Sequence, residues 1–275
     1  MRATGERVQP RRWWDLAPID QVLDPVPIWV LFLLFIVTGL AFYEGGVRAG
    51  LWWQSRTSHE ESGPAGILVG ALLALMAFLL GVAVNMASDR YDQRRSLVTE
   101  EANSIGTTYL RAGYLPEPQK EEIRDLIREY VPLRISTSDD DELLRRHAAS
   151  EPITMSLWAE AEDLAREAPE SDALALFIQS LNETIDLRTE RIVTNLQARV
   201  PETVLVVLLL GSALALGMVG YSAGLSGKRS LIGAVLVTVV LSLVLCLVID
   251  LDRPRDGSIQ VSQAPLEKLL DDISE

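Results

Sequence analysis

Apolar and polar side chains that could meet ions follow one another at helical spacing in the second apolar stretch of the sequence. Ala74, Phe78, Val82, Asn85 and Asp89 recur at intervals of three and four residues, so they fall on one line along a helix. An apolar ring can gate a pore by dewetting, and a polar ring beside it can meet the ion. The pattern therefore indicates ion permeation.

A stripe of small residues runs beside this line, and it has two interpretations. Gly66, Gly70, Ala74, Ala77 and Gly81 share one face. Small residues let helices approach closely in lipid, which is a purely structural role. The same stripe could line a water-filled path. One subunit with four helices cannot enclose a wide pore, so the second interpretation requires a homo-oligomer with this helix nearest the axis.

Charged side chains gather where the second and fourth apolar stretches end. We expect them at one membrane depth, just inside the cytoplasmic interface, and they are Arg90, Arg94, Arg95, Asp250, Asp252 and Arg253. The favoured interpretation is a set of salt bridges that ties the two spans together. The alternative is a cytoplasmic vestibule that attracts ions.

Residue patterns typical of enzymes are absent from the sequence. His59 and His147 are the two histidines, and neither lies at metal-ligand spacing from other candidate ligands. Neither a phosphate-binding glycine loop nor a serine nucleophile motif occurs. Cys246 is the single cysteine, so no disulfide can form within the chain. We expect no enzyme activity, no metal and no cofactor.

The elements that position these residues follow from composition. The 275 residues carry a formal charge of −13, yet mean hydropathy is +0.19, so apolar residues are concentrated in blocks. Four blocks, at 26–43, 65–87, 203–223 and 231–249, approach the length of ~20 residues that crosses a bilayer. The acidic balance without a basic patch argues against nucleic-acid binding.

The distribution of lysine and arginine predicts the orientation of the spans. One side has only Arg48, Arg56, Lys228 and Arg229. The other side has Arg7, Arg11, Arg12, Arg90, Arg94, Arg95, Arg188, Arg191, Arg199, Arg253 and Arg255. We therefore expect a multi-pass protein of the bacterial inner membrane, with both termini in the cytoplasm and membrane lipid around the spans.

The predicted fold is all-α, with four transmembrane helices split two and two by a helical cytoplasmic domain. Its segments are 1–25 (cytoplasmic), 26–87 (spans one and two), 88–199 (cytoplasmic domain), 200–249 (spans three and four) and 250–275 (cytoplasmic tail). Within 88–199 we predict helices at 88–112, 117–135 and 171–199. Between the last two, a short helix follows Ser138 and further helical sequence is interrupted by Pro152 and Pro169. A short helix is expected from Pro265.

Three motifs resemble the bestrophin-like family of bacterial membrane proteins. The first runs from Asn85 through Asp89-Arg90-Tyr91-Asp92-Gln93-Arg94-Arg95 to Glu100-Glu101-Ala102-Asn103-Ser104-Ile105-Gly106-Thr107. The second is Asp250-Leu251-Asp252-Arg253-Pro254-Arg255 with Gly257, Ile259, Val261-Ser262-Gln263 and Pro265-Leu266, and the third is Leu181-Asn182-Glu183, Ile185-Asp186 and Arg188. The resemblance covers most of the chain from about residue 65.

More distantly, the chain is similar to the bestrophin ion channels. That resemblance implies a pentamer, a pore lined by the second span and conduction of small inorganic ions, mostly anions. Ala74 and Val82 are smaller than a bestrophin neck leads one to expect, and the acidic calcium-binding run after the last span is missing. The gating stimulus therefore stays open.

Charge and resemblance disagree about the ion. The acidic cytoplasmic segments would concentrate cations, whereas the resemblance implies chloride. Charges at the pore outweigh distant ones because the Debye length is ~8 Å at physiological salt, so anions are favoured. The alternative function is a non-conducting membrane scaffold or sensor whose acidic helical domain binds a partner.

Overall fold

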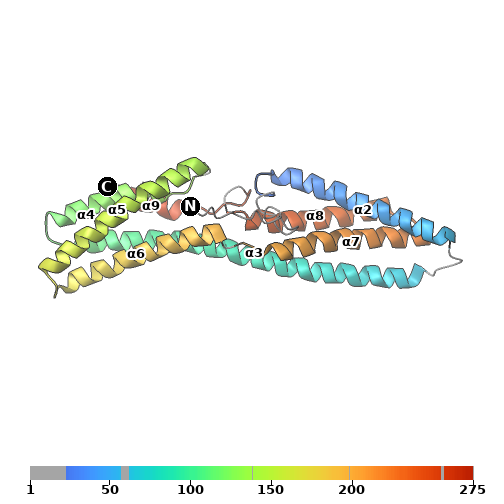
Figure 1. Cartoon of the computed structure of the whole chain (residues 1–275), viewed down its shortest axis with the longest axis horizontal. Helices are drawn as coiled ribbons and strands as arrows, with labels where there is room; N and C mark the ends of the chain where they lie inside the picture. Colours follow the sequence, from blue (N-terminus) through green and yellow to red (C-terminus); the bar gives the residue numbers. More distant parts are fainter. Residues whose placement is uncertain (1–22, 57–61, 138, 198, 255–256, 275) are drawn as a thin grey trace, which may run out of the picture. The chain divides into compact units, whose positions relative to one another are not determined.

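The computed structural model describes residues 23–56, 62–137, 139–197, 199–254 and 257–274. Within these ranges the regular structure is helical throughout, and four helices are long and apolar enough to cross a membrane. Two of the four come before the helices between residues 119 and 197, and the other two come after them (Figure 1). The all-α prediction, with spans split two and two, is confirmed.

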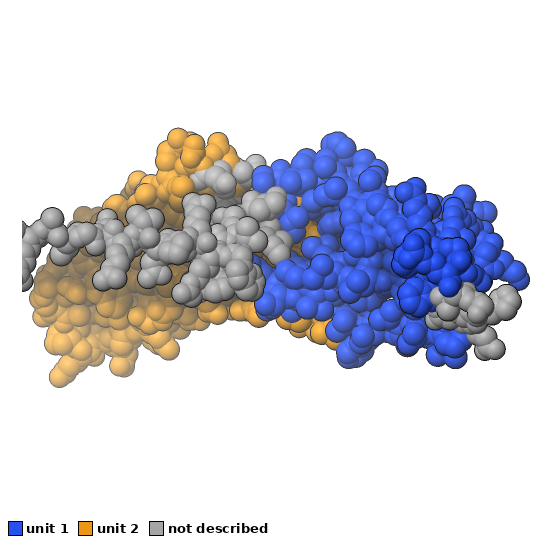
Figure 2. All heavy atoms as spheres, turned by 45° about the vertical axis from the view of Figure 1, so that its right-hand side comes forward, with its two compact units in different colours: residues 1–80, 201–246 blue, residues 81–200, 247–275 orange. Residues whose placement is uncertain are grey.

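The chain divides into two compact units, coloured separately in Figure 2. Unit 1 comprises residues 1–80 and 201–246, and unit 2 comprises 81–200 and 247–275. Unit 1 therefore contains α2 (Ile28–Arg56), the first part of α3 (Ser62–Ala112), α7 (Glu202–Ser226) and most of α8 (Leu231–Asp252). Unit 2 contains the rest of α3 and α8 with α4 (Gln119–Arg134), α5 (Asp140–Glu167), α6 (Asp172–Gln197) and α9 (Ala264–Ser274).

In unit 1, glycines bring the backbones of α2 and α7 into direct contact. A Cβ added at Gly46 would overlap the carbonyl oxygen of Gly217, and one added at Gly220 would overlap that of Tyr43. Lower on the same crossing, Gly50 and Gly224 each face the backbone of the other helix, with their added Cβ atoms 3.1 Å from the opposite glycine Cα. Such close approach is how helices associate where lipid supplies no hydrophobic drive.

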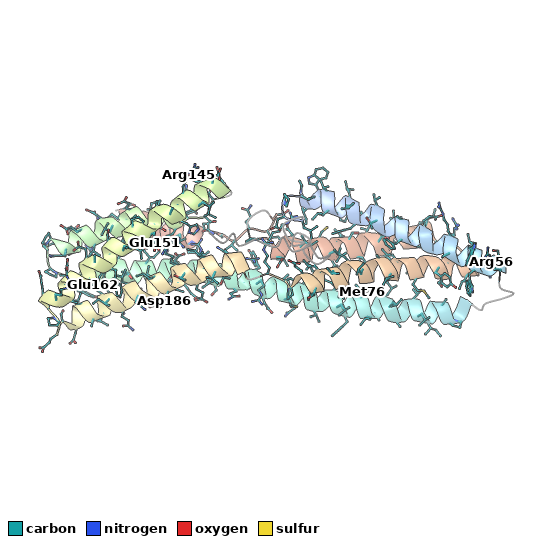
Figure 3. The ribbon with its side chains drawn as sticks, in the orientation of Figure 1. Arg56, Met76, Arg145, Glu151, Glu162 and Asp186 are labelled. Atoms are coloured by element: carbon teal, nitrogen blue, oxygen red, sulfur yellow. The ribbon has the colours of Figure 1, made fainter. Side chains whose placement is uncertain are left out.

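The first part of α3 packs on α7 through a different kind of contact. Met76 is buried, and its sulfur lies 2.5 Å from the position of a Cβ added at Gly211, so the glycine makes room for the methionine (Figure 3). A flexible thioether fills such a space well. The face of α3 that carries Met76 therefore turns toward α7.

Unit 2 has an apolar core of the kind found in water-soluble helical domains. Buried side chains come from α3, α4, α5, α6 and α9, among them Ile105, Ile127, Leu157, Phe177 and Leu266. They recur at the three-and-four spacing of amphipathic helices. The last helix, α9, is included in this core, so the tail after the fourth span folds back onto the unit.

The structure differs from the prediction at Pro152. The sequence analysis expected this proline to interrupt the helical sequence, but α5 continues through it as one helix from Asp140 to Glu167. Ile153 and Leu157, just after the proline, are buried in the core, and this packing offsets the hydrogen bond that proline cannot donate. Pro132 likewise lies inside α4, which ends two residues later at Arg134.

Candidate functional site

The line predicted to face a pore lies on α3, and the described protomer leaves it uncovered. In unit 1, Ala74 is exposed and Phe78 is 67% exposed. In unit 2, Val82 is 44% exposed, and Asn85 and Asp89 are also exposed. A large aromatic side chain exposed to this degree in a span must meet either lipid or another copy of the chain.

The opposite face of α3 is buried. Met76 and Leu80 are buried in unit 1, and Ala83 and Ala87 are buried in unit 2. These four recur at helical spacing, about half a turn from the exposed line. One face of α3 therefore packs against its own protomer, and the other face is uncovered by it.

The small residues of α3 do not serve close packing within the protomer. A Cβ added at Gly66, Gly70 or Gly81 would meet nothing within 4 Å. Ala74 and Ala77 are exposed as well. Gly46 and Gly50 of α2 and Gly220 and Gly224 of α7 behave in the opposite way, so the structural role proposed for small residues applies at these positions. The α3 stripe is therefore open to lipid, to a neighbouring copy or to a water-filled path.

The polar end of the line has a defined local geometry. The amide nitrogen Nδ2 of Asn85 donates a hydrogen bond to Oδ2 of Asp89 over 3.0 Å, one turn further along the helix. Both side chains are exposed. The arrangement presents a carboxylate held by an amide, which is a surface that attracts cations at close range.

The charged group at the ends of the spans separates into buried and accessible members. Arg94, Asp250, Asp252 and Arg253 are each less than a tenth exposed. Arg90 is half-buried, with its Nη1 3.4 Å from Oε1 of Gln93, and Arg95 is exposed. Arg90 and Arg95 are therefore the members of the group with the most access to solvent.

Arg94 closes the end of α8. Its Nη2 donates to the carbonyl oxygen of Leu251 over 2.5 Å, and its Nη1 lies 3.4 Å from that of Asp252. Carbonyls in the last turn of a helix have no partner within the helix, and arginine side chains satisfy them well.

The two aspartates of α8 hold connecting segments by their backbone. Oδ1 of Asp252 accepts a hydrogen bond from the amide of Val200 over 2.7 Å, at the junction between α6 and α7. Oδ1 of Asp250 accepts from the amide of Ser258 over 2.7 Å. A Cβ on Gly257 would lie 2.8 Å from the carbonyl oxygen of Asp250, so this tight passage requires glycine. These contacts are structural.

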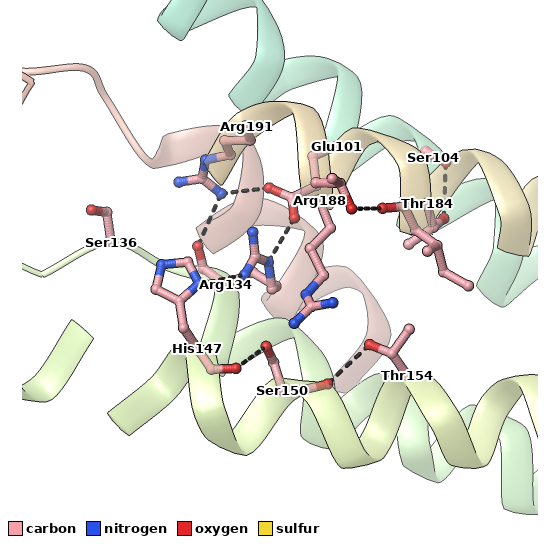
Figure 4. A network of polar contacts seen from close by, with 12 residues as sticks. Glu101, Ser104, Arg134, Ser136, His147, Ser150, Thr154, Thr184, Arg188 and Arg191 are labelled. Carbon is pink, nitrogen blue, oxygen red and sulfur yellow. Dashed lines mark hydrogen bonds and ion pairs between the residues drawn. The ribbon is translucent and has the colours of Figure 1, made fainter. Parts of the chain in front are cut away.

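The sequence analysis missed a buried ion network centred on Glu101. Glu101 is fully buried, and its two carboxylate oxygens accept from Nε of Arg134 over 2.6 Å and from Nη1 of Arg191 over 2.5 Å (Figure 4). Nη1 of Arg191 also donates to the carbonyl oxygen of Arg134 over 3.0 Å. The network thus joins α3, α4 and α6.

Two signals in the sequence could have revealed this network. Glu101 lies between Val98, Ala102 and Ile105 on what is otherwise the apolar face of its helix. Arg188 and Arg191 interrupt the apolar face of α6 and are both buried. Buried charges are nearly always paired, so a lone acid and two bases on facing apolar stripes predict an ion pair.

His147 lies at the edge of the network and is held neutral. Its Nδ1 is 3.2 Å from Nη1 of Arg134, and since arginine only donates, Nδ1 accepts. The pKa of His147 is lowered to about 4. Burial is the largest cause; the nearby charges of Arg134, Arg191 and Arg188 also lower the pKa, and the charge of Glu101 raises it. Burial also raises the pKa of Tyr130, on the adjacent helix, to about 12.

Chemically, the candidate site is the exposed face of α3, and the buried ion network around Glu101 lies further along the same helix. Within the part of the chain that the structure describes, no three His, Cys, Asp or Glu side chains come together as a metal site would require. The arrangement offers a surface for passing ions or for a neighbouring copy.

Comparison with known proteins gives the chain's relatives. No curated protein sequence matches it. The fold matches solved structures of a bacterial bestrophin homologue from Klebsiella pneumoniae, one with a TM-score of 0.61 and 16% identity over 90% of this chain and 95% of that chain. A point variant of that homologue gives a TM-score of 0.62 and 16% identity, over 90% and 97% of the two chains. A crystal structure described as that of a membrane protein gives a TM-score of 0.63 and 16% identity, over 90% of this chain and 97% of that chain.

At this level of identity the matches establish the fold, and the predicted bestrophin-like architecture is confirmed. The sequence itself carries the remaining information, because the bestrophin-like domain matches residues 45–266. This range takes in all three motifs on which the resemblance rested. The chain belongs to the bestrophin-like family.

Proposed function

We propose that the protein is a homo-oligomeric ion channel of the bacterial inner membrane whose pore is lined by α3. The observation that supports this is the exposed line of Ala74, Phe78, Val82, Asn85 and Asp89, with the buried face of the same helix turned toward the protomer. The resemblance of the sequence motifs to the bestrophin channels favours a pentamer. No chemistry and no cofactor form part of this proposal.

The proposed division of the chain follows the sequence boundaries. Residues 26–87 and 200–249 lie in the membrane, and 1–25, 88–199 and 250–275 lie in the cytoplasm. The imbalance of arginine and lysine between the two sides supports this orientation.

Phe78 and Val82 form the apolar constriction of the proposed pore, and Asn85 and Asp89 the polar ring beside it. A constriction of apolar side chains resists wetting, and its truncation admits water and ions. Arg90 and Arg95 are the vestibule charges in the proposal. Arg94, Asp250, Asp252 and Arg253 are assigned the structural role that their burial and hydrogen bonds describe.

Ion flux into liposomes tests the proposal. Purified protein of verified oligomeric state should pass chloride, and Phe78→Ala or Val82→Ala should raise the flux several-fold. Leu236→Ala is the matched control: Leu236 lies on α8 and is 60% exposed, so truncation there removes exposed apolar surface away from the proposed pore. Flux no greater than that of empty liposomes would leave the scaffold or sensor as the function.

The choice between anions and cations is tested at Asp89. The family resemblance favours chloride, whereas the exposed Asp89 carboxylate favours cations. If anions are conducted, Asp89→Asn should raise the ratio of chloride to potassium flux, because it removes a like charge from the path. A ratio unchanged by the substitution would place Asp89 away from the ion path.

A further inference from the structure

A small polar cavity of about 90 Å³ lies within unit 2, away from the proposed pore face. Four segments wall it: α3, α6, the link between α4 and α5, and the segment that leads from α8 to α9. The lining residues are Arg94, Val98, Ser136, Thr137, Arg191, Asn195, Pro254, Gln260, Val261 and Gln263. The cavity has room for about three waters at ~30 Å³ each, or for one small oxyanion.

The wall of the cavity carries positive charge. Arg94 and Arg191 line it and are 2% and 5% exposed. Among the residues of described placement, no aspartate or glutamate lines it. Arginine side chains present planar donor forks that match carboxylate and phosphate oxygens.

The ion network behind the wall balances the charge of Arg191 only in part, while Arg94 has the carboxylate of Asp252 nearby. Arg134 and Arg191 share the single carboxylate of Glu101, so this part of the network retains one net positive charge. Burial is the main cause of the lowered pKa of His147; among the nearby charges, Arg134, Arg191 and Arg188 lower this pKa and Glu101 raises it. An anion in the cavity would balance the field at short range and low dielectric.

Hydrogen-bond donors remain for a ligand. Arg191 has five N–H groups, and Glu101, the Arg134 carbonyl and Oε1 of Gln263 occupy three of them. The half-buried Asn195, one turn further along α6, also lines the cavity and carries an amide that can donate. Ser136 and Thr137 line it as well, and their hydroxyls can donate.

We propose that this cavity is a binding site for a small oxyanion of the phosphate or carboxylate class. A ligand there would contact α3, α6, Pro254 and residues 260–263 together. Binding would therefore stabilise the packing of residues 260–263 against α3 and α6. The site is separate from the pore face, and its occupancy does not depend on whether the protein conducts.

Binding is measured on the full-length protein in detergent with inorganic phosphate and with acetate. Thermal unfolding and calorimetric titration are run at constant ionic strength, with chloride as the replacement anion. Phosphate or acetate should raise the unfolding temperature in a saturable way. A response to phosphate alone or to acetate alone identifies which oxyanion geometry the site accepts, and both support the proposal.

The decisive variant is Asn195→Asp, which places a negative charge in the wall without changing its volume. We expect the dissociation constant to rise at least ~tenfold through repulsion at short range. Asn103→Asp is the matched control, because Asn103 is exposed on α3 and does not line this cavity; its affinity should equal that of the unsubstituted protein. Asn195→Leu, which removes the amide without adding charge, covers the case in which Asn195→Asp does not fold.

Two results would overturn the proposal. One is a shift in unfolding temperature that chloride reproduces at the same concentration, which would indicate general screening. The other is an affinity that neither substitution at Asn195 alters while the control behaves normally. Neither result bears on conduction, which the flux assay measures independently.

Discussion

The two units achieve cohesion by opposite means. In unit 1, α2 and α7 meet through Gly46, Gly50, Gly220 and Gly224, with backbone against backbone. In unit 2, large apolar side chains fill the centre, and Glu101 with its two arginines is buried beside them. One unit removes side chains to bring helices together, and the other buries both apolar and charged side chains.

The difference fits the proposed division of the chain between membrane and cytoplasm. Lipid tails are as apolar as leucine, so burial of leucine gains little in a membrane, and contact between backbones becomes the source of affinity. Water drives apolar side chains inward, and the resulting core can also hold charges if they are paired. Many exposed apolar side chains of unit 1, such as Ile67 and Ile232, fit the same account.

The largest expected effect comes from neutralising the centre of the ion network. Glu101→Gln keeps the shape of the side chain but leaves Arg134 and Arg191 buried without a counter-charge. We expect the free energy of unfolding to fall by about 3–5 kcal/mol, measured by thermal or denaturant unfolding followed by circular dichroism. Glu100→Gln, on the adjacent exposed position, should change it by no more than ~0.5 kcal/mol.

If the two substitutions had equal effects, the ion network would contribute nothing specific to unit 2. The contrast with unit 1 would then rest on the apolar core alone.

The next largest effect tests the glycine contact of unit 1. Gly46→Ala adds a methyl group where the backbone of Gly217 already lies, and a backbone cannot rotate away as a side chain can. We expect a loss of roughly 1–3 kcal/mol, typical of overpacking, measured as thermal stability in detergent.

Gly45→Ala provides the control at the neighbouring position, where an added Cβ meets nothing within 4 Å. It should be neutral or slightly stabilising, because alanine favours the helix more than glycine does. Equal losses at both positions would mean that helix propensity, and not contact between α2 and α7, decides the outcome.

The smallest expected effect is a pH dependence confined to unit 2. The pKa of His147 is lowered to about 4 in the folded protein, against about 6.5 in an unfolded chain. The unfolded state therefore binds more protons between these values, so stability is full above about pH 6.5 and declines as pH falls toward about 4.

Because His147 is only half-buried, solvent screening reduces the loss to about 1 kcal/mol. His147→Gln should remove this part of the pH dependence, seen as a flatter curve of unfolding free energy against pH. Parallel curves for the two proteins would show that the pKa of His147 is the same in the folded and unfolded states.

The sequence predicted much of this molecule because its strongest signals are local. The extension of α3 from the span to Ala112, the start of α6 at Asp172 and the helix after Ala264 all follow from apolar periodicity and from proline and glycine positions. The prediction that Pro152 interrupts the helix failed for a tertiary reason. Ile153 and Leu157, in the turn after the proline, are buried in the core, and this packing keeps the helix continuous. The roles of Glu101 and Arg94 also depended on partners distant in sequence.

By itself, the sequence determined the helical class, the four candidate spans, the family and the line of residues along α3. These depend on spacing within single helices, which residue order specifies directly. Only the tertiary structure decided which glycines pack against a helix and which face outward, because that depends on the rotation of each helix about its own axis. It also decided that Arg94, Asp250, Asp252 and Arg253 are buried as structural contacts, since burial is a property of all neighbouring helices together.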